Sequence, residues 1–345
     1  MKLIWILALF AVSVSAYPLE DDTHINGENG WYVPQIDGSF VWMDKEEAES
    51  KLAELEQQET LEGRALTTVP VKYYLYTKSN QYTPQEITAT KKSITASHFN
   101  GKNPTRFVIH GWTQSYNDPM NSGIRDAWLS HGDHNIIIVD WGRARSVDYA
   151  SSVIAVPATG KKVGSMIEYL HKSHGMSLET LDVIGHSLGA HVAGYAGKSV
   201  TSGEVHTIVG LDPALPLFSY DKPDKRLNSE DGFYVESIQT DGGKLGFLKP
   251  IGKGAFYPNG GKSQPGCGID ATGSCAHGRS VTYYIEAVKE NDFPTMKCGN
   301  YEEAVAKSCG SSYSSVRMGA VSNAYMVAGD YYVPVNSKAP FGKAA

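Results

Sequence analysis

The sequence predicts an α/β protein with a mostly parallel central sheet flanked by helices. Strand-like and helix-like segments alternate along residues 69–211, the pattern of a parallel sheet covered on both faces. The apolar run Asn135–Val139 is typical of a strand buried on both sides. A serine flanked by glycines at 185–189 stands between a strand and a helix. The length of 345 residues suits a single catalytic domain, which we expect over residues 67–345.

Period and composition predict each element in turn. Apolar residues at i, i+3, i+4 and i+7 indicate a helix at 163–170, and β-branched or aromatic runs bounded by turn residues indicate strands. The full expectation is strands at 69–76, 105–109 and 135–139, a helix around 163–170, a strand at 181–184, a helix at 190–198 and a strand at 205–211.

The first 16 residues have the organisation of a cleaved secretory signal. Lys2 precedes an apolar run from Leu3 to Val14, and the small residues Val14 and Ala16 precede Tyr17 as at a cleavage site. The run is too short to span a bilayer comfortably. We therefore expect a secreted, extracellular protein without a transmembrane anchor.

Residues 17–66 are an acidic leader or propeptide. Residues 17–64 carry 13 acidic residues against three basic ones. Within them, 45–62 has helix formers with apolar spacing at Leu52 and Leu55. This segment could be a short amphipathic helix packed on the enzyme, a propeptide, or a solvated leader. Arg64 would suit removal by a trypsin-like protease.

Charge and cysteine content limit the partners and the redox setting. The net charge is −6, with no basic block, so nucleic-acid binding is not expected. In a secreted chain, four cysteines indicate two disulfides with three permitted pairings, and local pairing closes the shortest loops. A zinc site is the competing interpretation, but the spacings are not of the C-x₂-C type. The cysteines are Cys267, Cys275, Cys298 and Cys309.

The segment Gly185-His186-Ser187-Leu188-Gly189 fits G-x-S-x-G. It follows the strand LDVI and opens a helix of small residues, which is the context of a nucleophile elbow in an α/β-hydrolase fold. Flanking glycines let the chain turn sharply and hold the Ser187 hydroxyl above the sheet. The alternative is a structural serine in a tight turn.

Asp212 and His277 complete a catalytic triad by chain order. The order in α/β-hydrolases is Ser, then Asp or Glu, then His. Asp212 ends the strand VHTIVGL, at the edge of a parallel sheet where catalytic groups gather. His277 is the only histidine after Asp212, so it must supply the base if the triad exists.

An oxyanion hole is expected from two backbone N–H groups. One is that of Leu188, after the nucleophile, and the second is that of Trp112, in the loop that follows the strand FVI. His110 in the same loop is more suited to bracing it by hydrogen bonding than to acting as a base.

At this point the residues resemble a known family. The segments HGW, GHSLGAHVAGYAG, GLDPALP and CAHGRSVTYY occur in this order and are similar to the catalytic domain of the pancreatic lipase family over 69–330. The resemblance implies the same triad, Ser187, Asp212 and His277. It also implies the disulfides Cys267–Cys275 and Cys298–Cys309, and an insect-type secreted lipase or phospholipase A1.

Three departures from the family pattern refine this expectation. The chain ends without the C-terminal β-sandwich of longer relatives, so no colipase partner is expected. Only seven residues separate Cys267 from Cys275, too few for an amphipathic lid helix, and the loop 241–257 is also short, as in the phospholipase A1 and galactolipase-like branch. The segment Arg226–Asp231 matches the family's calcium loop, but Asn228 replaces an aspartate, so we expect no metal and no cofactor.

The expected function is a secreted carboxylic ester hydrolase acting on lipids at a lipid–water interface, a triglyceride lipase, a phospholipase A1, or both. The alternative is a lipid-binding or yolk-type storage protein on the same fold, and a protease is a third, less favoured option. Retention of the serine, aspartate and histidine favours the enzyme.

Overall fold

Ten strands form one sheet in the computed structural model, which describes residues 23–61 and 69–343. The signal segment 1–16 and Arg64 lie outside the described residues. The elements are β1 (Gly30–Pro34), β2 (Phe40–Asp44), α1 (Lys45–Leu61), β3 (Val71–Tyr76), β4 (Gln85–Ile87), α2 (Lys91–Thr95), β5 (Thr105–Ile109), α3 (Pro119–His131), β6 (Asn135–Trp141), α4 (Tyr149–His174), β7 (Leu181–His186), α5 (Leu188–Ser199), β8 (Thr207–Leu211), β9 (Tyr234–Ile238), β10 (Gly254–Pro258), α6 (Ser274–Glu290), β11 (Met296–Lys297), α7 (Tyr301–Ala306) and β12 (Gly329–Val333).

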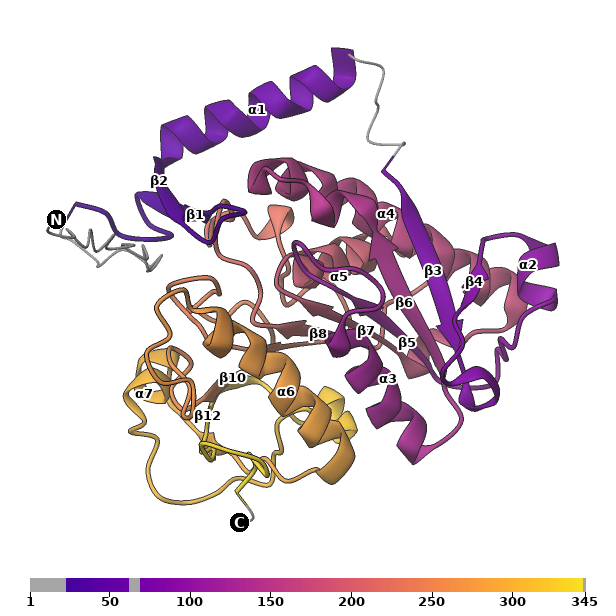
Figure 1. The fold of residues 1–345 in the computed structure, drawn as a ribbon. Coiled ribbons are helices and arrows are strands. Elements are labelled where there is room, and N and C mark those ends of the chain that lie inside the picture. The colour runs from indigo at the N-terminus through magenta and orange to yellow at the C-terminus, as the bar shows by residue number, and fades with distance from the viewer. Residues whose placement is uncertain (1–22, 62–68, 344–345) are drawn as a thin grey trace, which may run out of the picture.

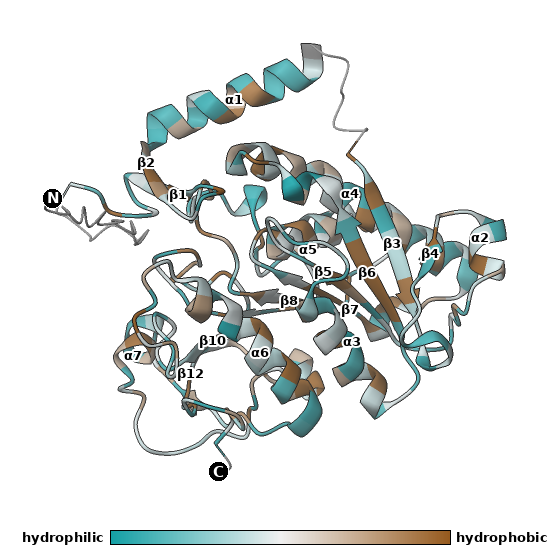
Figure 2. Cartoon of the chain, in the orientation of Figure 1, coloured by the Kyte–Doolittle hydropathy of each residue, from teal (hydrophilic) through white to brown (hydrophobic). Residues whose placement is uncertain are grey.

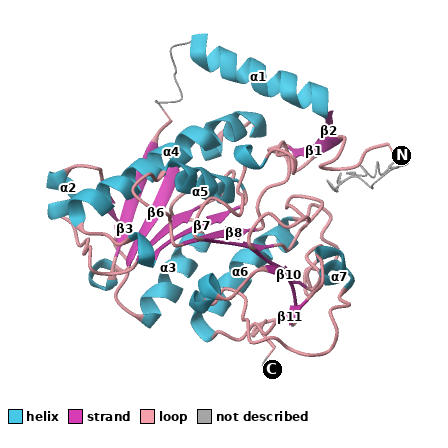
Figure 3. Ribbon diagram, turned by 180° about the vertical axis from the view of Figure 1, so that it is seen from behind, coloured by secondary structure: helices cyan, strands magenta, loops and turns pink. Residues whose placement is uncertain are grey.

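The strand order is β11-β12-β10-β9-β8-β7-β5-β6-β3-β4. Neighbouring strands from β12 through to β6 pair in parallel, while β3, β4 and β11 join antiparallel at the two edges. Helices lie on both faces, with α4 and α5 on one and α3 and α6 on the other (Figures 1 and 3). This is the α/β-hydrolase fold that the sequence predicted, with a mostly parallel sheet.

Alternate side chains of the central strands enter two separate cores. In β5, Phe107 and Ile109 pack into the core beneath α4 and α5, while Val108 packs into the core beneath α3 and α6. Side chains of a strand alternate between faces, so a strand covered on both sides is apolar throughout. The strongest apolar colour accordingly lies in the central strands (Figure 2).

The predicted elements all occur. The strands predicted at 135–139 and 181–184 and both helices are longer than predicted, while those at 69–76 and 205–211 are shorter. The helix expected at 163–170 is α4, which extends back through Pro157 to Tyr149. A proline inside a helix removes one hydrogen bond, but the residues before it, Val153 to Val156, are buried in the core and hold the helix there. Strands β9, β10 and β12 were not expected from the sequence. Residues 254–257 of the expected loop 241–257 belong to β10.

In its described part, residues 23–61, the predicted leader contains a β-hairpin followed by a helix. Strands β1 and β2 pair antiparallel, and α1 extends above α4 (Figure 1). Ala48 of α1 is buried, and Leu52 and Leu55 pack against the core that includes α4. A helix packed on the body of the protein is therefore present at 45–61, and the interpretation of 17–66 as a propeptide stays a prediction. The hairpin was not predicted.

Candidate active site

Ser187 occupies a strained turn between β7 and α5. Its backbone has φ 56° and ψ −123°, outside the regions that L-residues favour. The glycines on either side permit this turn: a Cβ on Gly185 would lie 2.1 Å from the Gly189 carbonyl oxygen, and one on Gly189 would lie 2.2 Å from the Ile109 carbonyl oxygen. The sequence therefore forms the strand–serine–helix turn only with glycine at both positions.

The turn lies where the strand order changes direction. β5 pairs with β6 on one side and with β7 on the other. The chain continues from β5 to β6 and from β7 to β8, so the loops that leave the carboxyl ends of β5 and β7 run in opposite directions. Ligands of open α/β sheets bind at such a switch point. The loop after β5 is held there because the Gly111 N–H donates to Gln114 Oε1 (2.8 Å).

Asp212 and His277 are in direct contact. His277 Nδ1 lies 2.6 Å from Asp212 Oδ2, and the other oxygen, Oδ1, accepts from the backbone N–H of Thr240 (2.7 Å) and of Asp241 (3.0 Å). The Asp212 side chain is fully buried. Because a carboxylate only accepts hydrogen bonds, the proton of neutral His277 sits on Nδ1, and Nε2 is left as the basic nitrogen.

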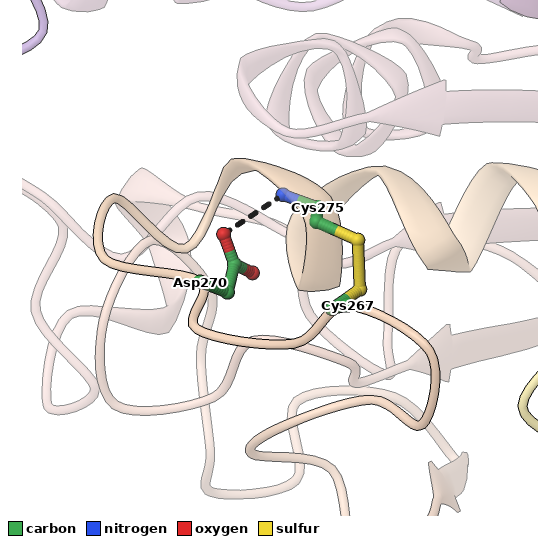
Figure 4. A group of neighbouring side chains, drawn as sticks. All are labelled: Cys267, Asp270 and Cys275. Carbon is green, nitrogen blue, oxygen red and sulfur yellow. Dashed lines mark hydrogen bonds between the residues drawn. A yellow bond between two sulfur atoms is a disulfide. The ribbon is translucent and has the colours of Figure 1, made fainter.

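The first turn of α6 positions His277. Asp270 caps this helix, accepting from Cys275 N–H at Oδ1 (3.2 Å, Figure 4) and from Ala276 N–H at Oδ2 (2.7 Å). The Cys267–Cys275 disulfide ties the preceding loop to the same turn. The cap and the disulfide together restrict how far His277 can move.

The zinc interpretation is wrong for the cysteines. Cys267, Asp270 and Cys275 bring potential ligand atoms together, but both sulfurs are consumed in the disulfide and a metal needs thiolate. Cys298 and Cys309 form the second disulfide. Both pairings match those implied by the family resemblance.

Burial keeps two side chains next to the Asp212–His277 pair neutral. Burial, with the nearby charge of Asp212, raises the pKa of Asp241, so Asp241 adds no second negative charge beside Asp212. Burial, with the nearby His277, lowers the pKa of His186 well below its usual range. His186, whose ring centroid is 4.5 Å from that of His277, therefore stays uncharged and does not oppose protonation of His277.

His110 braces the loop after β5. Its Nε2 lies 3.0 Å from Asp140 Oδ1, and its carbonyl accepts from Trp141 Nε1 (2.9 Å). Burial opposes ionisation of Asp140, but hydrogen bonds from His110 and Arg145 lower its pKa to about 2. His110 is fully buried and does not line the cleft described next, which agrees with a bracing role.

Ser187 and His277 line one cleft of about 430 Å³. Most of its walls are apolar, and Trp112 contributes to them. Within the described chain no hydrogen bond joins Ser187 Oγ to His277, a contact that often tightens only with substrate bound. The lining residues are Pro34, Gln35, Ile36, Gly38, Phe40, Trp112, Thr113, Gln114, Tyr149, His186, Ser187, Pro216, Leu245, Thr272, Ser274, His277 and Gly278.

The two expected oxyanion donors have no competing protein acceptor. Leu188 is the first residue of α5, where backbone N–H groups lack partners within the helix. Among the described residues, neither its N–H nor that of Trp112 donates to a protein group. The Trp112 side chain is fixed separately, because Nε1 donates to the Ser146 carbonyl (2.9 Å).

The segment resembling a calcium loop does not fit a calcium ion. Lys198 Nζ donates to the Arg226 carbonyl (2.9 Å) and to Asp231 Oδ1. Asp231 Oδ2 is used by the Asn228 N–H (2.9 Å). An ammonium group thus already occupies the oxygens that a hard cation would need.

The short disulfide loop forms another edge of the cleft. Residues 267–273 contain no helix, as expected from their number, and α6 begins directly after them. Thr272 and Ser274 from this region line the cleft.

In the described part of the chain, no helix is long and apolar enough to cross a membrane.

Several residues near the site were missed by sequence reasoning. They are Gln114, Asp270, Gly246 and the β1–β2 hairpin. Each of them acts through contacts with residues distant in the chain or through a loop conformation. Only Asp270 had a local signal: an acidic residue shortly before a helical segment is a capping pattern.

Comparison with known proteins identifies relatives over most of the chain. The family model described as Lipase matches residues 38–341. Pancreatic lipase-related protein 2 of Cavia porcellus is 36% identical over 250 residues, covering 70% of this chain and 57% of that protein. Pancreatic triacylglycerol lipase of Sus scrofa is 33% identical, covering 70% and 58%, and lipoprotein lipase of Rattus norvegicus is 31% identical, covering 72% and 58%. The chain thus spans less than two thirds of these relatives.

Proposed function

Because the chain belongs to the pancreatic lipase family, we propose that it is a secreted carboxylic ester hydrolase that acts on lipids at a lipid–water interface. Its catalytic residues would be Ser187, Asp212 and His277, with Trp112 and Leu188 as oxyanion donors. The observation that carries the proposal is the 2.6 Å contact between His277 Nδ1 and Asp212, beside a cleft shared by His277 and Ser187.

The chemistry follows from the tautomer of His277. Its Nε2 takes the proton of Ser187 Oγ as that oxygen attacks the ester carbonyl carbon. The resulting oxyanion accepts hydrogen bonds from the N–H groups of Trp112 and Leu188, each worth about 10²–10³ in rate in well-studied hydrolases. The tetrahedral intermediate collapses, the alcohol leaves with the proton from His277, and an acyl-enzyme remains.

Water then completes the cycle by the reverse proton path. His277 takes a proton from water, and the hydroxide attacks the acyl carbon. The bond from that carbon to Ser187 Oγ then breaks, Oγ takes the proton back from His277, and the fatty acid is released. Asp212 stabilises the imidazolium form of His277 in both half-reactions. Its two backbone donors, from Thr240 and Asp241, keep it in place.

The substrate class we propose is a triglyceride, the sn-1 ester of a phospholipid, or both. Relatives named as triacylglycerol lipases support the first. The short, helix-free loop between Cys267 and Cys275 supports the second, because it leaves the cleft open to a polar head group. Secretion is supported by the signal-like sequence at 1–16 and by two disulfides.

The test is hydrolysis by the full chain on matched triglyceride emulsions and phospholipid micelles. Ser187→Ala should remove nearly all activity, a loss on the order of 10⁶-fold in kcat by analogy with subtilisin. Ser165→Ala, an exposed serine on α4, is the matched control and should leave the rate unchanged.

The alternative is a lipid-binding protein on the same fold. A folded wild type that hydrolyses neither lipid nor soluble esters, and that binds fatty acid as well as Ser187→Ala does, would establish it. Activity insensitive to Ser187→Ala would instead reject the assigned nucleophile.

A further inference from the structure

The tip of the β1–β2 hairpin lies at the mouth of the catalytic cleft. Pro34, Gln35, Ile36, Gly38 and Phe40 all line the cleft that contains Ser187 and His277. Resting on the hydrolase function above, we propose that this hairpin is the acyl-chain-binding wall of the enzyme. Ile36 and Phe40 would contact the fatty acyl chain and set the preference for chain length.

The base of the hairpin is fastened to loops beside the triad. Trp31 Nε1 donates to the Phe218 carbonyl (3.1 Å), and Asn26 Nδ2 donates to the Gly243 carbonyl (2.9 Å). Trp31 is 4% exposed, so its burial and hydrogen bond hold the hairpin in one position. The base of the wall is therefore a fixed part of the fold.

Helix α1 fastens the other end of the hairpin. Lys51 pairs with Asp148 and Glu49 pairs with Lys222 across to the body of the enzyme. Arg143 pairs with Glu59 near the end of the helix. Exposed ion pairs contribute little individually, but the helix also packs its apolar residues on the core.

In the described hairpin, residues 35–39 form their hydrogen bonds within the hairpin itself. Gln35 N–H donates to the Ser39 carbonyl (2.8 Å), and Ser39 Oγ donates to Asp37 Oδ1 (2.6 Å). Within the described ranges, every hydrogen bond of residues 35–39 stays inside the hairpin. The tip can therefore adjust to an acyl chain without breaking hydrogen bonds to the enzyme body.

The chemistry of the cleft walls also indicates an acyl chain. Ile36 is 58% exposed while it lines the cleft, so it stands at the opening. Pro216 and Leu245 supply further apolar surface. The disulfide loop that occupies the lid position contributes only the hydroxyl residues Thr272 and Ser274. The hairpin, and not this loop, supplies apolar surface for the substrate.

Chain-length dependence with monomeric esters tests the wall. Each CH₂ withdrawn from water changes an affinity about fourfold. Ile36→Ser should lower kcat/KM for p-nitrophenyl octanoate by about tenfold and for the acetate by less than about twofold, because only the longer chain reaches the tip. Phe40→Ala, the second variant, should show the same selectivity for the longer ester.

Val41→Ser is the matched control. Val41 is an apolar residue of the same hairpin, 50% exposed, and it is not among the described residues that line the cleft. It should change both esters by the same small factor. Thermal unfolding of each variant confirms that the hairpin and the fold persist.

Binding of octanoate to Ser187→Ala protein provides a readout that does not need turnover. Adding Ile36→Ser should weaken this binding about fivefold to tenfold, and adding Val41→Ser should not. The proposal would be overturned if the Ile36 and Phe40 variants changed hydrolysis of the acetate and octanoate esters equally. It would also be overturned if truncating Ile36 or Phe40 increased the rate on both esters, which would identify the hairpin as an inhibitory segment. Absence of serine-dependent hydrolysis in the wild type, with octanoate binding that depends on Ile36, would reject the hydrolase function alone.

Discussion

His277 Nδ1 lies 2.6 Å from Asp212 Oδ2, although the two residues are 65 positions apart in the chain. The contact fixes the imidazole tautomer and leaves Nε2 without a proton, as the role proposed for His277 requires. Asp212 can serve this purpose because its other oxygen is held by two backbone N–H groups. The tautomer of the proposed base is thus set before substrate arrives.

Asp212→Asn should lower kcat by about 10⁴-fold, as the equivalent change does in trypsin. The asparagine oxygen would keep the N–H groups of Thr240 and Asp241, which turns its NH₂ towards His277 and forces the proton onto Nε2. The measurement is kcat on p-nitrophenyl butyrate, with Asp221→Asn, an exposed aspartate, as the control. Retention of more than about a tenth of the rate would show that Asp212 is not the triad acid.

Gly246→Ala should lower kcat with little effect on folding. A Cβ at residue 246 would lie 2.5 Å from the carboxylate atoms of Asp212, too close for van der Waals contact. Asp212 would have to move, and with it His277, and a displacement of about 1 Å costs roughly 10²-fold in rate. Gly132→Ala, whose Cβ would meet only His134 at ordinary distance (3.7 Å), should have near wild-type kcat. A wild-type rate for Gly246→Ala would mean that the carboxylate position is not critical.

Chelation of calcium should leave the thermal stability of the protein unchanged. Because Lys198 holds the oxygens of the loop 226–231, EDTA or added calcium should move the midpoint of thermal unfolding by less than about 1 °C. Lys198→Ala should destabilise the fold by about 3 kcal/mol, because it leaves the buried carboxylate of Asp231 unpaired. A calcium-dependent rise in the wild-type midpoint would contradict this assignment.

Glu236 should make stability fall as pH rises. Burial raises the pKa of Glu236 to about 7, even though hydrogen bonds from Asn323 and Tyr234 act in the opposite direction. Since the folded state holds this proton more tightly than the unfolded state, the contribution is complete below the unfolded pKa of about 4.5 and is lost as pH rises to about 7. Its size is on the order of 3 kcal/mol.

The check is urea unfolding of wild type and Glu236→Gln between pH 4.5 and 8. The difference in unfolding free energy between the two proteins should change between about pH 4.5 and pH 7, the unfolded and folded pKa values of Glu236, and level off above about pH 7. Glu204→Gln, an exposed glutamate, is the control and should run parallel to the wild type. A constant difference for Glu236→Gln at all pH values would mean that the folded protein does not retain the proton.

Local sequence was enough to predict the candidate nucleophile and the frame around it. The strands β5, β6 and β7 are buried on both faces, and each contains an apolar run, at 107–109, 136–139 and 183–184. A glycine-flanked serine between strand and helix has few conformations open to it. His277 could be predicted as the candidate base without knowledge of the geometry, because it is the only histidine that follows Asp212 in the sequence. These features depend on period, turn chemistry and chain order, all of which can be observed in the sequence.

The tertiary structure was needed wherever a residue acts through a distant partner. Trp31 Nε1 donates a hydrogen bond to the Phe218 carbonyl, although the two residues are 187 positions apart in the chain. No periodicity in 17–66 indicates that this segment packs beside the cleft. Lys198 reaches the oxygens of the loop 226–231 only because α5 passes beside it. Turns and amphipathic periods are encoded by neighbours in the chain, whereas the place where a hairpin docks depends on the shape and free energy of a surface assembled from many segments.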